Sequence, residues 1–163
     1  MKPLVDAARA KGMMIATAES CTGGMVSAAI TDTPGSSEVF DRGFVTYTNA
    51  AKEQMLGVHA ATLAAFGAVS EEVAREMATG ALAYSQAQIA VSITGIAGPG
   101  GSEHKPEGRV CFGLADVQAV RTETVEFGAL GRDKVRQAAC DHALGMLIAA
   151  LSQPVCSPSQ AHQ

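Results

Sequence analysis

The sequence predicts an α/β fold, a three-layer domain in which helices cover both faces of a mixed sheet. Two observations indicate this fold. Segments with apolar residues at helical spacing alternate along the chain with short runs of β-branched and apolar residues, which favours strands joined by helices. Two strand-like segments then follow each other directly around residues 117–119, which favours an antiparallel hairpin at one side of the sheet.

The first third of the chain predicts a helix, a strand, a turn and a second helix. Pro3 stands where a first helical turn tolerates proline, and Gly12 ends that helix. Residues 13–17 form a short apolar run typical of a buried strand. After a glycine pair, residues 25–30 carry apolar side chains at helical spacing until the TPG sequence at 33–35 stops them.

The middle of the chain predicts one strand and three helices. Residues 40–48 are rich in aromatic and β-branched side chains and predict the strand. Asn49 is the predicted cap of a helix over 50–56, and a short helix follows over 60–66. Ser70 caps the third helix, whose first turn carries two glutamates that the helix dipole favours.

The last third predicts three strands and the longest helix. Residues 88–94 alternate in the manner of a strand, and the glycine-rich residues 95–101 form an adaptable loop. Residues 109–116 and 120–127 are the two strands of the hairpin. The final helix spans 132–151, with its apolar residues on one face.

Length and composition indicate a single domain. The 163 residues are enough for one substantial core, so residues 1–151 are predicted to form one domain and residues 152–163 a disordered tail. A net charge of -4 and 4% aromatic residues argue against a nucleic-acid partner. Because the chain has no apolar run long enough for a membrane span and no secretory leader, we expect a soluble cytoplasmic protein with no membrane partner.

The cysteines and histidines predict neither disulfides nor a metal site. The four cysteines are scattered without paired spacing, which is typical of free thiols in a reducing compartment. The four histidines are equally dispersed, and no metal-ligand spacing occurs. We therefore expect no metal and no cofactor.

The turn after the first predicted strand, residues 17–24 (TAESCTGG), is the first candidate site. Hydroxyls, a thiol and two glycines at a strand-to-helix turn suit an exposed nucleophile or a bound anion. Ser20 is the preferred nucleophile, and Cys21 is its rival, although a free cysteine is more often inert packing. The structural alternative is a simple helix start with Thr22 as its cap.

The base that such a serine requires is less evident. None of the histidines stands in a segment that predicts a Ser-His-Asp system. Lys52 offers the other solution, a serine–lysine pair in which burial lowers the pKa of the amine, and Tyr47 is a candidate hydrogen-bonding partner. Lys52 lies near a predicted helix start, where the helix dipole disfavours a cation, so a purely structural role is mildly disfavoured.

Two further features suit an anionic ligand. Residues 94–101 (TGIAGPGG) bring backbone close to a ligand, although their spacing matches neither the P-loop nor the dinucleotide fingerprint. Arg132 and Arg136 lie one turn apart on the last helix and could hold a phosphate. A flexible turn and a solvated helix face are the structural alternatives.

These motifs together resemble the CinA C-terminal-domain family. The resemblance covers residues 3–151 and rests on five segments in the family's order: AESCTGG at 18–24, PGSS at 34–37, GFVTY at 43–47, GAVS at 67–70 and GIAGP at 95–99. The stand-alone members of this family are nicotinamide-mononucleotide amidases. The resemblance therefore implies hydrolysis of the carboxamide of nicotinamide mononucleotide to nicotinic acid mononucleotide and ammonia, without a metal, in pyridine nucleotide recycling.

The resemblance also implies a role for each candidate residue. Ser20 is the implied nucleophile, Lys52 its general base and Tyr47 an assisting group. The remaining candidates are implied to bind substrate, with the first four shaping the oxyanion pocket, the next three lining the nucleotide site and one of the two arginines holding the phosphate: Cys21, Thr22, Gly23, Gly24, Thr94, Gly95, Gly98, Arg132 and Arg136.

Two other functions stay open at this point. A non-catalytic nucleotide-binding or regulatory member of the family would keep the same motifs, and a related amidase would act on another pyridine or pyrimidine nucleotide. The alanine-rich helices suit an ordinary core and a dimer interface equally well, and we expect a homo-oligomer such as a dimer.

Overall fold

The computed structural model describes residues 1–102 and 104–153, and the predicted tail lies outside them from residue 154 onward. All the predicted helices and strands are present. In chain order the elements are α1 (Lys2–Lys11), β1 (Ile15–Glu19), α2 (Met25–Thr31), the 3-10 turn η1 (Ser36–Glu38), β2 (Phe40–Val45), α3 (Asn49–Leu56), α4 (Ala60–Phe66), α5 (Glu71–Ala83), β3 (Ile89–Gly95), β4 (Arg109–Asp116), β5 (Val120–Glu126) and α6 (Arg132–Ser152).

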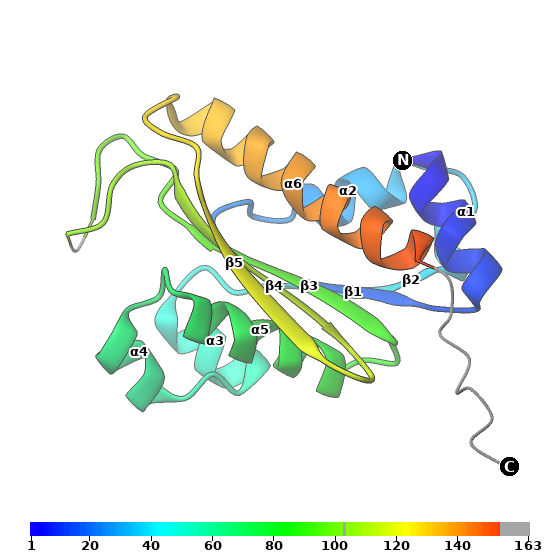
Figure 1. Ribbon diagram of the computed structural model, residues 1–163. Coiled ribbons are helices and arrows are strands. Elements are labelled where there is room, and N and C mark those ends of the chain that lie inside the picture. Colours follow the sequence, from blue (N-terminus) through cyan, green and yellow to red (C-terminus); the bar gives the residue numbers. More distant parts are fainter. Residues whose placement is uncertain (103, 154–163) are drawn as a thin grey trace, which may run out of the picture.

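The five strands form one mixed sheet in the order β2-β1-β3-β4-β5. Strand β1 is parallel to both β2 and β3, whereas β3–β4 and β4–β5 are antiparallel. Helices α1, α2 and α6 cover one face and α3, α4 and α5 cover the other (Figure 1). The predicted three-layer α/β fold with a mixed sheet is confirmed.

Each face of the sheet has its own core. On the α6 face, Phe112 and Ile93 from the strands pack with Leu147 and Val135 of α6. On the α5 face the sheet contributes small residues such as Ala16 and Ala90, which pack with Met77 and other apolar residues. Small side chains on this face let α5 lie close to the strands.

The order of the strands creates the site. The chain leaves β1 toward β2 on one side and later returns through β3 on the other, so β1 lies at a topological switch point. The carboxyl ends of these three parallel strands share one edge of the sheet. In open α/β sheets this edge is where ligands bind.

Strands β1 and β2 differ most from the predicted ranges. Strand β1 runs on to Glu19, because it pairs with a parallel neighbour on each side along its whole length, so the turn starts at Ser20. Strand β2 ends at Val45, three residues early, and Thr48 rather than Asn49 caps α3, through a hydrogen bond from Ala51 N–H to Thr48 Oγ1 of 3.0 Å.

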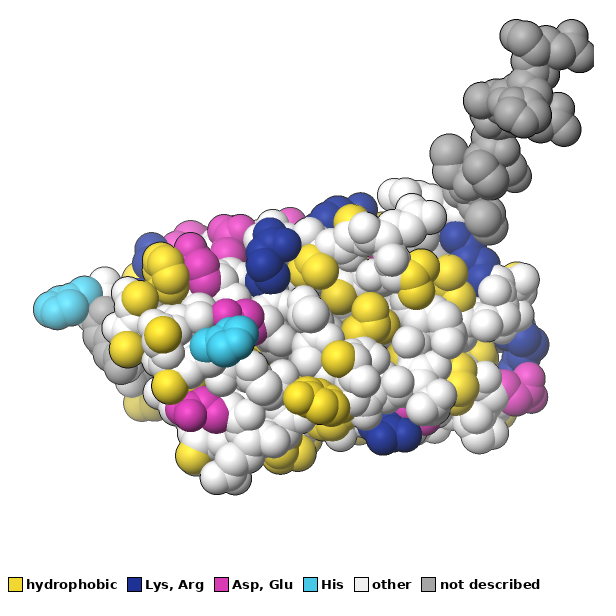
Figure 2. Space-filling view, turned by 90° about the horizontal axis from the view of Figure 1, so that it is seen from below, with side chains coloured by type: hydrophobic (Ala, Val, Ile, Leu, Met, Phe, Trp, Pro, Cys, Tyr) yellow, Lys and Arg dark blue, Asp and Glu magenta, His cyan; other side chains and the backbone are white. Residues whose placement is uncertain are grey.

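The face formed by α3, α4 and α5 is mixed in character. Figure 2 shows hydrophobic side chains scattered among polar ones, with acidic and basic side chains close together along the upper edge of the view. Within the described chain, every helix is too short or too polar to span a lipid bilayer.

Candidate active site

Ser20 is the first residue after β1 and is held in place by the sheet. Its N–H donates to Ile93 O of β3 at 2.9 Å, so its position is fixed from the neighbouring strand. The serine is 8% exposed. Gly23 and Gly24 have φ of 59° and 106°, a region that other residues rarely adopt, which explains the glycine pair at the entry to α2.

The N-cap residue of α2 is Gly24, and the Glu19 carboxylate satisfies N–H groups of the first turn, so the prediction of Thr22 as the cap is wrong. The Glu19 carboxylate accepts hydrogen bonds from Val26 N–H at 2.9 Å and from Ser27 N–H at 3.0 Å. Ser27 Oγ donates to the same carboxylate at 2.8 Å. Glu19 thereby ties the strand end to the helix start and fixes the turn between them. The sequence signal for it was a glutamate at the end of an apolar strand, next to the glycine turn.

Lys52 reaches Ser20 from the first turn of α3. The residue is 1% exposed, and its Nζ lies 3.0 Å from Ser20 Oγ. The amine also donates to Thr46 O at 2.9 Å and to Tyr47 O at 3.4 Å. Burial lowers the pKa of the Lys52 amine to about 8.

A buried amine beside a serine hydroxyl can act as a general base. With a pKa of about 8, a substantial share of Lys52 is neutral near pH 8 and can accept a proton from Ser20. Cys21 is a poorer nucleophile in this setting, since burial raises the pKa of its thiol to about 11 and keeps it protonated.

The Ser20–Lys52 pair lies in a cavity of about 350 Å³. Its walls come from the turn after β1, the segment after β2, the connection between α4 and α5, and the loop after β3. Asn49, which the sequence suggested only as a helix cap, also lines this cavity. A volume of this size is near the lower end of the range for small-molecule sites.

The two candidate arginines have different positions. Arg132 lines the cavity, where its guanidinium donates to Gly98 O at 2.7 Å and to the Tyr47 hydroxyl at 2.8 Å. Arg136 faces the turn instead and donates to Cys21 O at 3.0 Å and to Thr22 O at 3.3 Å. Arg132 is therefore placed to meet a ligand, whereas Arg136 braces the turn that carries Ser20.

The model of the CinA C-terminal domain matches residues 1–151, the part of the chain that builds this cavity. The chain belongs to the CinA C-terminal domain family. The family resemblance predicted from the motifs is confirmed.

Relatives in this family are closely similar over most of the chain. The nicotinamide-nucleotide amidohydrolase PncC of Escherichia coli is 54% identical, with 87% of each protein covered. A CinA-like protein of Chlorobium phaeobacteroides is 57% identical over 74% of this chain, which spans only 30% of that longer protein.

Solved structures of the family share the fold. The competence/damage inducible protein of Agrobacterium tumefaciens has a TM-score of 0.85 at 48% identity, covering 93% of this chain and 96% of that one. The competence damage-inducible protein of Klebsiella pneumoniae has a TM-score of 0.90 at 37% identity, covering 93% and 94%.

The loop after β3 supplies the other predicted contacts of this CinA domain. Thr94, Gly95 and Gly98 all line the cavity. The Thr94 hydroxyl donates to Ala68 O at 2.8 Å, which joins the loop to the α4–α5 connection. A Cβ at Gly95 would lie 2.7 Å from Val110 Cγ2 and 3.1 Å from Cys21 Sγ, so a glycine at this position lets the loop lie close to both.

Tyr47 contributes to the cavity in two ways. Its carbonyl contacts the Lys52 amine, while its hydroxyl accepts from Arg132 and its side chain is largely exposed. Thr22, Gly23 and Gly24 do not line the cavity, although Cys21 does. In the described residues no group of three His, Cys, Asp or Glu side chains is arranged to hold a metal, and the predicted free thiols Cys21, Cys111 and Cys140 are unpaired.

Proposed function

We propose that this CinA domain is a nicotinamide-nucleotide amidohydrolase that releases ammonia from the carboxamide of nicotinamide mononucleotide. The observation that carries the proposal is the buried Lys52 amine, 3.0 Å from Ser20 Oγ inside a cavity. The names of the PncC relatives, which are 54% identical over most of the chain, supply the substrate. A buried amine next to a hydroxyl is suited to acyl transfer.

The proposed reaction has two steps. Ser20 Oγ attacks the carboxamide carbon while neutral Lys52 takes the hydroxyl proton, and the lysine returns that proton to the departing ammonia. An ester between Ser20 and the nucleotide remains. Water, deprotonated by the same amine, then attacks the ester and releases nicotinic acid mononucleotide, and the proton returns to Ser20 Oγ.

The developing negative charge on the carboxamide oxygen requires hydrogen-bond donors. Of the predicted residues 21–24, at the entry to α2, we assign this role to the backbone N–H groups of Cys21, which lines the cavity, and of Thr22. The Gly23 N–H already donates to Ser20 O at 3.0 Å. Arg136 supports this assignment because it holds the carbonyls of Cys21 and Thr22 and thereby fixes the peptide planes of the turn. A trans peptide directs its N–H opposite to its C=O, so the N–H of Thr22 faces away from that guanidinium. Loss of one such donor costs about 3 kcal/mol of transition-state stabilisation.

Arg132 is the proposed phosphate-binding residue. It lines the cavity and presents a guanidinium, which suits a phosphate. Its hydrogen bonds to Gly98 O and to the Tyr47 hydroxyl preorganise it between the two loops, so we propose that Tyr47 assists by orienting Arg132 as well as by its carbonyl contact to Lys52.

An assay of ammonia release from a small panel of carboxamide nucleotides tests the proposal. We expect nicotinamide mononucleotide to be the preferred substrate and the activity to survive exhaustive chelation. Tight binding of the nucleotide without ammonia release would favour a binding or regulatory module, and preference for another base would favour a different amidase. The predicted homo-oligomer and cytoplasmic location stay predictions.

A further inference from the structure

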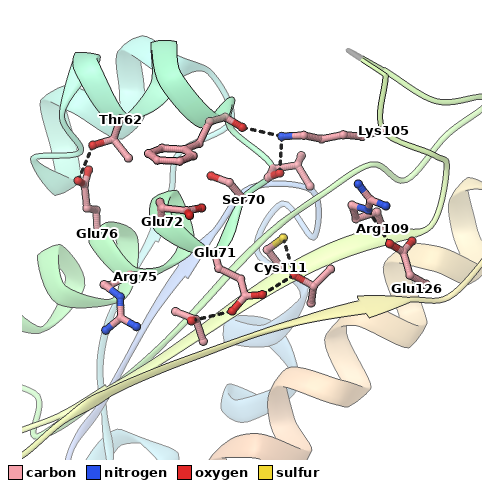
Figure 3. Close-up of a pocket in the computed structure, with 14 residues that line it drawn as sticks. Thr62, Ser70, Glu71, Glu72, Arg75, Glu76, Lys105, Arg109, Cys111 and Glu126 are labelled. Atoms are coloured by element: carbon pink, nitrogen blue, oxygen red, sulfur yellow. Dashed lines mark hydrogen bonds and ion pairs between the residues drawn. The ribbon is translucent and has the colours of Figure 1, made fainter.

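A second, larger hollow adjoins the cavity. This groove has a volume of about 890 Å³ and lies between the helices α4 and α5 and the strands β4 and β5 (Figure 3). Val69 and Lys105 line both the groove and the active-site cavity. These two residues therefore stand at the boundary between the two hollows.

Lys105 bridges this boundary with two hydrogen bonds. Its Nζ donates to Phe66 O at 2.6 Å and to Val69 O at 2.7 Å, so its side chain reaches across from the loop after β3 to the α4–α5 connection (Figure 3). Its backbone is anchored as well, because Lys105 and Ser102 exchange N–H···O bonds of 2.8 and 2.9 Å.

The carbonyls that Lys105 contacts belong to residues 66–69, a short segment that we call the wall. Phe66 ends α4, where backbone carbonyls lack intrahelical partners and a cation is favourable. Thr94 Oγ1 donates to Ala68 O between the two Lys105 contacts. Three of the four carbonyls of the wall therefore accept a side-chain hydrogen bond from the segment that begins at Thr94. Two of these bonds come from the Lys105 ammonium.

The groove beyond the wall is poorly suited to a phosphate. Four glutamates and three cations line it. Like Lys105, its other two cations are already engaged, since Arg75 donates to Val120 O at 3.2 Å and Arg109 pairs with Glu126 at 2.5 Å. An added phosphate there would meet more negative than positive charge.

We infer that Lys105 confines the substrate of this site to a mononucleotide. The inference rests on the proposed function. A mononucleotide carries one phosphate, which Arg132 can hold inside the cavity of about 350 Å³. A dinucleotide carries a second phosphate and a second nucleoside, and the adjoining groove is the hollow that could hold them. Lys105 closes the way into that groove, and the carboxylates behind it oppose the second phosphate.

The test compares ammonia release from nicotinamide mononucleotide and from nicotinamide adenine dinucleotide. In Lys105→Ala we expect the ratio of kcat/KM for dinucleotide over mononucleotide to rise severalfold, because the passage opens while the four glutamates of the groove still oppose the second phosphate. Lys105→Met, which keeps the length of the side chain but loses both hydrogen bonds, should give a smaller rise. Arg75→Ala is the matched control, because Arg75 is a cation that donates to a backbone carbonyl in the groove away from the cavity; its ratio should not change.

An unchanged ratio in a folded, active Lys105→Ala or Lys105→Met would overturn the inference, and so would an equal rise in Arg75→Ala. The proposed function fails separately, if the wild-type protein releases no ammonia from nicotinamide mononucleotide. In that case calorimetric binding of the two nucleotides to the same three variants decides the inference, with the same expected order of ratios.

Discussion

The cavity at the end of β1 and the groove beside it differ in how their polar groups are satisfied. In the groove, Glu71 accepts from the hydroxyls of Thr122 and Thr124 at 2.9 Å each, and Glu76 accepts from Thr62 at 2.6 Å. In the cavity, Lys52 is buried without a carboxylate partner among the described residues.

The pairing of the polar groups distinguishes a structural hollow from a catalytic one better than the volume of the hollow does. The groove is the larger hollow, but its paired side chains stabilise the contact between α5 and the β4–β5 hairpin. An amine in a buried site costs stability unless it is neutral or well paired, so its presence indicates a functional demand. We therefore propose that the smaller hollow is the reactive one.

The largest expected effect is the loss of activity in Ser20→Ala, which is compared with Ser70→Ala in the groove. Ser20→Ala removes the nucleophile and should lower ammonia release from nicotinamide mononucleotide by at least about a thousandfold. Ser70→Ala, in the groove, should leave kcat within about twofold, because Ser70 does not line the cavity. If Ser20→Ala were as active as wild type, the assignment of the cavity rather than the groove as the reactive site would be wrong.

Lys52→Met should be nearly as damaging, because it removes the base but keeps an unbranched side chain in the buried site. We expect a loss of about a hundredfold or more in kcat, with a melting temperature at or above that of wild type at pH 7, where the buried amine is protonated at a cost. Lys134, exposed on α6, provides the control variant Lys134→Met. Retained activity in Lys52→Met would exclude a lysine base.

The sign of the stability change follows from the lowered pKa of Lys52. The unfolded chain holds this proton up to about pH 10.4, whereas the folded protein releases it near 8. Between these values the unfolded state binds more protons, so this group's contribution to stability rises with pH and its cost is fully present below about 8.

Smaller effects on KM and kcat are expected from the two arginines, and they distinguish phosphate binding from support of the Ser20 turn. Arg132→Ala should raise KM for the nucleotide by roughly tenfold to a hundredfold and leave the KM of the phosphate-free nucleoside unchanged, since a charged hydrogen bond is lost. Arg136→Ala should instead lower kcat for both, because it loosens the turn that carries Ser20. If Arg136→Ala selectively weakened phosphate binding, the two assignments would have to be exchanged.

The smallest effect is the cost of Ser70→Ala to stability. Ser70 Oγ accepts from Val73 N–H at 3.2 Å and donates to Gly67 O at 2.9 Å, and so caps α5. Its loss should cost about 1 kcal/mol and lower the melting temperature by about 2–4 °C. Differential scanning calorimetry measures this shift, and a much larger one would show that the groove has a wider role in the core.

The fold was largely predictable because each element carries its own local signal. The apolar alternation of β3, the glycines that end α1 and α3 and the Ser70 cap are all features of neighbouring residues. The early end of β2 was not predictable, because Thr46 and Tyr47 are residue types that favour strands. In the structure their backbone carbonyls accept hydrogen bonds from the Lys52 amine instead.

The site was predictable in its members but not in their arrangement. Ser20 and Lys52 stood out by residue type, yet their 3.0 Å contact depends on two parallel strands meeting at one edge. Arg132 and Arg136 are equivalent in sequence spacing and are separated only by which loop each one reaches. The hydrogen bonds of Glu19 to the start of α2 depend on the turn at residues 20–24, which brings the end of β1 next to the start of the helix.

The pH dependence of kcat/KM for ammonia release from nicotinamide mononucleotide tests the central claim most directly. If buried Lys52 must be neutral to accept the Ser20 proton, kcat/KM should rise with pH to a plateau, with an apparent pKa of about 8. A kcat/KM that does not change between pH 6 and 9, about the range where this amine titrates, would contradict the serine–lysine mechanism.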